Sequence, residues 1–167
     1  MNAALMLGLL FACGEEAPKK EAAKVEAKEE AKAEVKEEVP AADPAPAAAR
    51  TGEQVFQQVC VTCHQANGQG MAGVYPPLAG SDWMAKSNET LIKIVLHGLM
   101  GEIEVNGTKY NQVMSPWGGA LNDEEVANVL TYVRSSWGNT GDAVKPEEVK
   151  AVRDANTGHG PWNAADL

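Results

Sequence analysis

Apolar residues recur at helical spacing in four separate stretches of the chain. The first stretch follows the i, i+3, i+4, i+7, i+8 pattern of one buried helix face, through Val55, Phe56, Val59, Cys60 and Cys63. A second run lies at 91–99, a third at 126–137, and a shorter one follows Pro146. These stretches predict an all-α domain of three to five helices.

The ends of the expected helices carry capping residues. Thr51, with Gln54 three residues later, fits a capping box, and Asn122 precedes an acidic first turn. Gly138 is expected to end the third helix, and Pro146 occupies the first position of the fourth.

Two segments lack this helical pattern. Residues 102–110 alternate in polarity around the pair Asn106-Gly107, which predicts a short β-hairpin insertion. Residues 158–167 show no periodicity and are expected to be irregular, with His159 in solvent.

The N-terminal residues predict a targeting signal and a membrane anchor. Residues 3–12 are apolar or glycine and precede Cys13. This run is too short for a membrane-spanning helix of about 20 residues and has the length of a signal-peptide core. Residues 10–13, Leu-Phe-Ala-Cys, resemble the bacterial lipoprotein signal, in which the cysteine is acylated and becomes the mature N-terminus. A plain secretory signal and a buried N-terminal segment are the alternatives.

A change of composition follows this segment. Residues 14–50 are rich in Ala, Glu, Lys and Pro and contain no aromatic residue, Leu or Ile, so they cannot bury enough surface to fold alone. We expect a tether, disordered or partly helical, or a spacer without a specific role. The expected organisation is a signal segment at 1–13, the tether at 14–50, a folded domain at 51–142 and a helical extension at 143–167.

Charge and cysteine count exclude several classes of protein. The net charge is −9, and residues 51–142 carry nine acidic and four basic residues, so a nucleic-acid partner is not expected. Three cysteines cannot form a closed disulfide framework.

The run Cys60-Val61-Thr62-Cys63-His64 carries the most specific chemistry. Two thiols three residues apart can each form a thioether to a haem vinyl group, and the next residue then presents its imidazole to the iron. A thioredoxin-type dithiol would need a βαβ context, and a structural zinc site would need four ligands. The motif therefore predicts one covalently bound haem c.

Residues 51–138 resemble a class I c-type cytochrome domain. In that family a glycine and an aromatic residue of the first helix pack against an apolar and an aromatic residue of the last, positions filled here by Gly52 and Phe56 and by Val129 and Tyr132. The resemblance implies the cytochrome c fold around one haem, a bacterial monohaem protein and a function in electron transport.

The resemblance also implies residues of the haem pocket. Pro76, twelve residues after His64, matches a proline whose carbonyl accepts a hydrogen bond from the ligand imidazole. Tyr75 and Trp117 are candidates for packing against the haem or for hydrogen bonds to its propionates, as is Trp83, for which a core position is at least as favoured.

The second axial ligand has to be chosen among several residues. Met114 follows His64 by 50 residues and lies in an irregular stretch before the last helix, where the family places its ligand loop. Met84 and Met100 flank an apolar helix and are interpreted as packing residues, and Met71 is too close to His64 in sequence. Met114 is the predicted ligand. Another methionine, a histidine or an open site is the alternative.

These residues predict an electron carrier, alone or as a fixed subunit of a larger oxidoreductase, because no general base, nucleophile or substrate pocket can be named. Its expected place is the periplasmic face of a bacterial membrane, between a quinol-oxidising complex or dehydrogenase and a terminal oxidase or reductase. A haem sensor or peroxidase is the remote alternative. The acidic domain favours docking through apolar contacts or a basic patch on the partner.

Overall fold

The first helix connects the capping box to the Cys60–His64 motif. The computed structural model describes residues 49–167, so the expected signal segment, Cys13 and the tether up to residue 48 lie outside the described residues. Helix α1 (Gly52–Val55) continues through a π-helical turn, η1 (Phe56–Cys60), into α2 (Val61–His64). The predicted capping box is confirmed, because Gln54 N donates to Thr51 Oγ1 at 3.3 Å and Thr51 N donates to Gln54 Oε1 at 2.9 Å.

The π-helical turn divides the predicted apolar face in two. Val55 and Phe56, before or at the start of the turn, are fully buried, whereas Val59, Cys60 and Cys63 are only half-buried. A π-turn shifts the residues after it relative to α-helical periodicity. The first part of this helix therefore packs into the core, and the last part faces a cavity described below.

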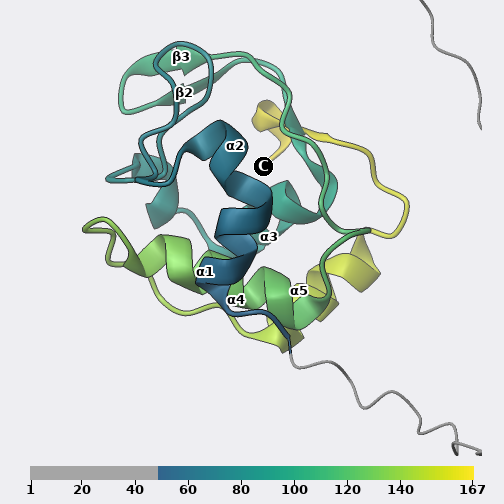
Figure 1. The fold of residues 1–167 in the computed structure, drawn as a ribbon. Helices are drawn as coiled ribbons and strands as arrows, with labels where there is room; N and C mark the ends of the chain where they lie inside the picture. The colour runs from purple at the N-terminus through teal and green to yellow at the C-terminus, as the bar shows by residue number, and fades with distance from the viewer. Residues whose placement is uncertain (1–48) are drawn as a thin grey trace, which may run out of the picture. The chain divides into compact units, whose positions relative to one another are not determined.

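The first helix crosses α4 (Asp123–Ser135) at a point that admits no side chain (Figure 1). A Cβ on Gly52 would lie 2.6 Å from the Cβ of Tyr132, and the Phe56 and Tyr132 ring centroids are 5.7 Å apart. Val129 is buried in the same core. The contacts implied by the family resemblance are thus present.

Helix α4 begins as expected and ends earlier than expected. The Asn122 capping box is formed with Glu125. The expected end at Gly138 was wrong, because the helix stops at Ser135, where the Ser136 hydroxyl donates to the Tyr132 carbonyl at 2.6 Å. Trp137 has a φ of 53° and turns back to Phe56, at 5.0 Å between centroids, so it does not continue the apolar helix face.

Two more helices complete the core. Helix α3 (Asn88–His97) follows the 3-10 turn η2 (Asp82–Ala85), and α5 (Pro146–Ala155) begins with Pro146 in its first turn, as expected. Both pack against α4 and against each other. No helix within residues 49–167 is long and apolar enough to cross a membrane.

Short strands accompany the helices. Strands β2 (Ile103–Val105) and β3 (Thr108–Tyr110) pair antiparallel, and Asn106 and Gly107 between them have φ values of 50° and 77°. This pair docks on η2, because Asp82 N donates to Asn106 Oδ1 at 3.0 Å and Trp83 Nε1 donates to the Glu104 carbonyl at 2.8 Å.

The C-terminal end is more regular than expected. Strand β4 (Trp162–Asn163) pairs in parallel with β1 (Leu99–Met100), and η3 (Ala164–Asp166) follows. In Figure 1 this end is the yellow segment that follows α5. His159 is exposed, as expected, but its ring stacks on Trp162 with 3.7 Å between centroids. The expectation of an irregular end was therefore wrong.

We expect Gly52→Ala to lower the free energy of unfolding by about 1–3 kcal/mol, because the added methyl group would force α1 away from α4. Gly119→Ala is the matched control, since a Cβ there meets no atom within 4 Å. Chemical denaturation of the two variants would measure the difference. Equal stabilities would show that the helix crossing tolerates a side chain.

Candidate haem-binding site

One apolar cavity brings the predicted site residues together. The space inside it is about 800 Å³ when its open mouth is included. Side chains from the first helix, the 76–78 loop, α3, β1, β2 and α4 line it, and its only ionisable side chains among the described residues are Cys60 and His64. A second opening shares Cys60, His64 and Met114 and adds Cys63 and Tyr75.

His64 is held in one tautomer at the cavity wall. Its Nδ1 lies 3.0 Å from the Pro76 carbonyl, which can only accept, so Nδ1 carries the hydrogen and Nε2 keeps its lone pair. Burial lowers the pKa of His64, against the opposite effect of the Pro76 carbonyl. The imidazole is therefore neutral, the form that binds a metal through Nε2.

The loop that carries Pro76 is folded tightly against His64. Gly70 N donates to the His64 carbonyl at 2.9 Å, and a Cβ on Gly70 would lie 2.6 Å from the Pro76 carbonyl oxygen. Gly70 has a φ of 62°, which a side chain would also oppose. Gly70 therefore helps to place Pro76, a role that sequence reasoning missed although the glycines at 68, 70 and 73 signalled a strained loop.

The two motif cysteines are free and lie at the cavity. Burial, with a smaller effect of Cys63, raises the pKa of Cys60 to about 11, so this thiol is protonated near neutral pH. Within residues 49–167 no group of three or more His, Cys, Asp or Glu could hold a metal ion, so the zinc alternative lacks ligands there.

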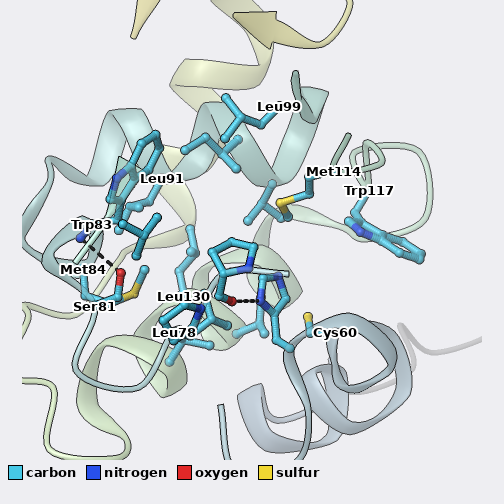
Figure 2. A pocket seen from close by; sticks show the side chains of 18 of the residues that line it. Cys60, Leu78, Ser81, Trp83, Met84, Leu91, Leu99, Met114, Trp117 and Leu130 are labelled. Atoms are coloured by element: carbon cyan, nitrogen blue, oxygen red, sulfur yellow. Dashed lines mark hydrogen bonds between the residues drawn. The ribbon is translucent and has the colours of Figure 1, made fainter. Parts of the chain in front are cut away.

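Met114 reaches the same cavity from another part of the chain. Its backbone pairs with Leu99, since Met114 N donates to the Leu99 carbonyl at 2.9 Å and Leu99 N donates to the Met114 carbonyl at 3.1 Å. Figure 2 shows Met114 and Cys60 at the cavity, with Leu99 and Trp117 on the side of Met114. A thioether and a neutral imidazole thus line one enclosed space.

The other candidate ligands are placed less favourably. Met71 and Met100 are 49% and 44% exposed and do not line the cavity, so the interpretation of Met100 as a packing residue was wrong. Met84 is buried at the cavity, as expected of a packing residue. His97 donates from Nδ1 to the His159 carbonyl at 3.1 Å, away from the cavity lining.

The remaining predicted pocket residues also lie here. Pro76 and Trp117 line both openings, and Tyr75 lines the second. Trp83 lines the first while its indole nitrogen is bonded to the hairpin, so it serves packing and docking together. Two thiols, an imidazole and a thioether around an apolar space are groups that could attach a haem c and ligate its iron.

Comparison with known proteins identifies the family of the chain. The family described as "Cytochrome C oxidase, cbb3-type, subunit III" matches residues 47–133, just over half of the chain. The chain belongs to this family of c-type cytochromes. Haem c, attached covalently, is therefore the cofactor of this cytochrome, and single-electron transfer is its function.

Some relatives of the cytochrome are named as a cytochrome alone, and others as subunits of larger enzymes. Cytochrome c-552 of Thermus thermophilus is 45% identical over 115 residues, which are 64% of this chain and 76% of the relative. The cytochrome c subunit of a quinone alcohol dehydrogenase from Gluconacetobacter polyoxogenes is 30% identical over 122 residues, 70% of this chain and 26% of the relative. Subunit CcoP of a cbb3-type oxidase from Azospirillum brasilense is 30% identical over 108 residues, 63% and 36% of the two chains.

Proposed function

We propose that this cytochrome passes electrons between respiratory membrane complexes, from a quinol-oxidising complex or dehydrogenase to a terminal oxidase or reductase. The observation that carries the proposal is the convergence of His64 and Met114 on one apolar cavity. No Asp, Glu, Lys or Arg side chain lines that cavity within the described residues, and the proposal assigns its one imidazole, His64, to the iron, so no residue of the lining is left to serve as a general acid or base. The names of the relatives, which include subunits of a dehydrogenase and of an oxidase, support the choice of partners.

In this proposal each site residue has one role. Cys60 and Cys63 bind haem c as thioethers, and His64 and Met114 are the axial ligands of its iron. Pro76 orients His64 and makes the imidazole more electron-rich, while Tyr75 and Trp117 form walls of the pocket. When bound, the haem supplies a one-electron iron couple, and a Met/His ligand pair raises its potential and leaves no easy position for a substrate.

A fixed subunit of a respiratory complex is the second candidate. Several relatives are named as subunits of larger enzymes, whereas cytochrome c-552 is named as a cytochrome alone. Solubilising membranes gently and isolating the cytochrome would separate the two. A fixed subunit stays with the complex at high salt, and a mobile carrier leaves it.

The proposed organisation places the domain at the periplasmic face of the membrane. Acylated Cys13 would hold the chain to the bilayer, residues 14–50 would act as a tether, residues 51–142 would form the cytochrome domain, and residues 143–167 would extend it. A lipid-modified cysteine carrying several acyl chains anchors stably, because each buried CH₂ contributes about 0.8 kcal/mol.

A redox titration of the full-length holoprotein tests the ligand assignment. We expect one low-spin haem with a positive potential and a far-red Met–Fe(III) band. Met114→Ala should abolish the band and lower the potential by on the order of 0.1 V. Met71→Ala and Met100→Ala are matched controls that should keep both, since these side chains are exposed. Ready binding of carbon monoxide by the wild type would instead favour a sensor or peroxidase.

The anchor is tested by Cys13→Ser in the host bacterium. We expect the wild-type cytochrome to sediment with membranes and the variant to appear in the soluble fraction, because no acyl chain can be attached to serine. Haem content is the control, since the cytochrome domain is unchanged. A variant that stays in the membrane fraction would point to retention by a partner complex.

We propose that the cytochrome does not dock on its partners through a ring of its own lysines. Each of the four basic residues of 51–142 already has a contact: Lys93 pairs with Glu89 and Lys109 with Glu102, both at 2.7 Å, Lys86 lies 4.5 Å from the Trp83 ring centroid, and Arg134 is buried. The net charge of this region is negative. Its surface therefore favours a cationic or apolar partner face.

A cationic and an anionic small oxidant together test the negative electrostatic potential of this domain. We expect rising salt to slow oxidation of the reduced cytochrome by a cationic cobalt(III) complex and to speed oxidation by ferricyanide, because salt screens the acidic domain. Lys86→Gln, which removes an exposed cation, should change either rate by less than about twofold. The opposite salt trends would show a local basic face near the haem.

A further inference from the structure

The Met114 segment is held in place by strand β1. Residues between β3 and α4 form no helix or named strand of their own, and Met114 pairs with Leu99 through two backbone hydrogen bonds of 2.9 and 3.1 Å. Trp117 N and Gly118 N add bonds to the Val95 and Leu96 carbonyls, at 2.9 and 3.0 Å. The end of α3 and the start of β1 are therefore the support on which Met114 rests.

The C-terminal strand lies on the other edge of the same support. Leu99 is the register partner of Trp162 in the parallel β1–β4 pair, and Trp162 N donates to the Gly98 carbonyl at 3.1 Å. Gly98 also faces the Met114 segment, because a Cβ there would lie 3.1 Å from Pro116 N. Gly98 and Leu99 are thus fixed between Trp162 on one side and Met114 on the other.

Side chains lock the C-terminal strand to α3. His97 Nδ1 donates to the His159 carbonyl at 3.1 Å, and the His159 ring stacks on the Trp162 ring at an interplanar angle of 14°. Lys93 Nζ lies 4.9 Å from the Trp162 ring centroid. Trp162 therefore joins the two residues of β4 to the last turns of α3, which a two-residue strand pair could not do alone.

Helix α5 holds the other end of this tail. Val149 is fully buried, Arg153 Nε pairs with Asp123 at 2.7 Å, and Arg153 Nη2 donates to the Leu121 carbonyl at 2.9 Å. The tail between α5 and β4 therefore runs from an anchored helix to the support of Met114.

We propose that β4 positions Met114 as an iron ligand, with Trp162 as the residue that holds β4 in place. The inference rests on the proposed assignment of Met114. Without Trp162, β1 would keep its bonds to Met114 but lose its second partner, and two-residue strands with one partner are weakly held. The Met114 thioether would then leave the iron more often, while the covalent haem and His64 stay in place.

Carbon monoxide binding to the reduced full-length holoprotein measures this directly, because it requires the sixth position to be open. We expect Trp162→Ala to speed carbon monoxide binding by about tenfold, the effect of losing one or two backbone hydrogen bonds from the support. The far-red band of the oxidised variant should disappear at a lower temperature than its helical circular dichroism. Trp162→Phe, which keeps a flat ring for His159, should restore both to near wild-type values.

Trp137→Ala is the matched control for lost packing. Trp137 contacts Phe56 and Tyr132 beside the α1–α4 crossing, away from β4. Its loss should therefore lower the unfolding temperature without faster carbon monoxide binding. His159→Ala, which removes only the stacked ring, should give a smaller acceleration than Trp162→Ala, and it serves as the second variant should Trp162→Ala not fold.

The results separate the two proposals. Suppose that Met114→Ala binds carbon monoxide rapidly, while Trp162→Ala and His159→Ala bind it as slowly as the wild type. The proposed role of β4 would then be overturned, and the assignment of Met114 would stand. A Met114→Ala protein that binds carbon monoxide no faster than the wild type would overturn the ligand assignment and this inference together.

Discussion

The hydrogen bond from His64 Nδ1 to the Pro76 carbonyl is the constraint on which the site depends. It decides which imidazole nitrogen is free for a metal, and it requires the chain to return to His64 after only twelve residues. That return is possible because Gly70 packs its backbone against both the His64 and the Pro76 carbonyls. The conformation of the 65–78 loop therefore allows the hydrogen bond between His64 and Pro76, and it also places Leu78 at the cavity wall.

The apolar lining of the cavity also affects the reduction potential of the haem iron. A charged iron is costly in a medium that cannot solvate it, so burial favours the less charged reduced state and raises the potential. The acidic residues of the chain do not enter the lining among the described residues. Most of those within residues 49–167 are exposed, with Glu125 as a buried exception, so their charges influence encounters with partners more than the potential of the buried group.

Sequence reasoning identified what is encoded by neighbouring residues. The caps at Thr51 and Asn122, the helix beginning at Pro146 and the motif at Cys60–His64 each depend on a few consecutive positions, and the structure contains them. The π-helical turn and the early end of α4 were not foreseen. The early end of α4 accompanies a contact between distant segments, because Trp137 turns back onto Phe56, and such contacts override the local helical pattern. The β1–β4 pair escaped detection because two residues are too few to show a period.

The two walls of the cavity are held by contacts of different range. The wall with Cys60 and His64 belongs to one continuous helix and to a loop that closes within twelve residues. Met114 depends on Leu99, fifteen residues earlier, and through it on Trp162, 48 residues later. Contacts that are few and long-range open at a lower free-energy cost than a packed helix does. Release of the Met114 side is therefore a local event of this fold, separate from the unfolding of the α1–α4 core, and the C-terminal extension sets how often it occurs.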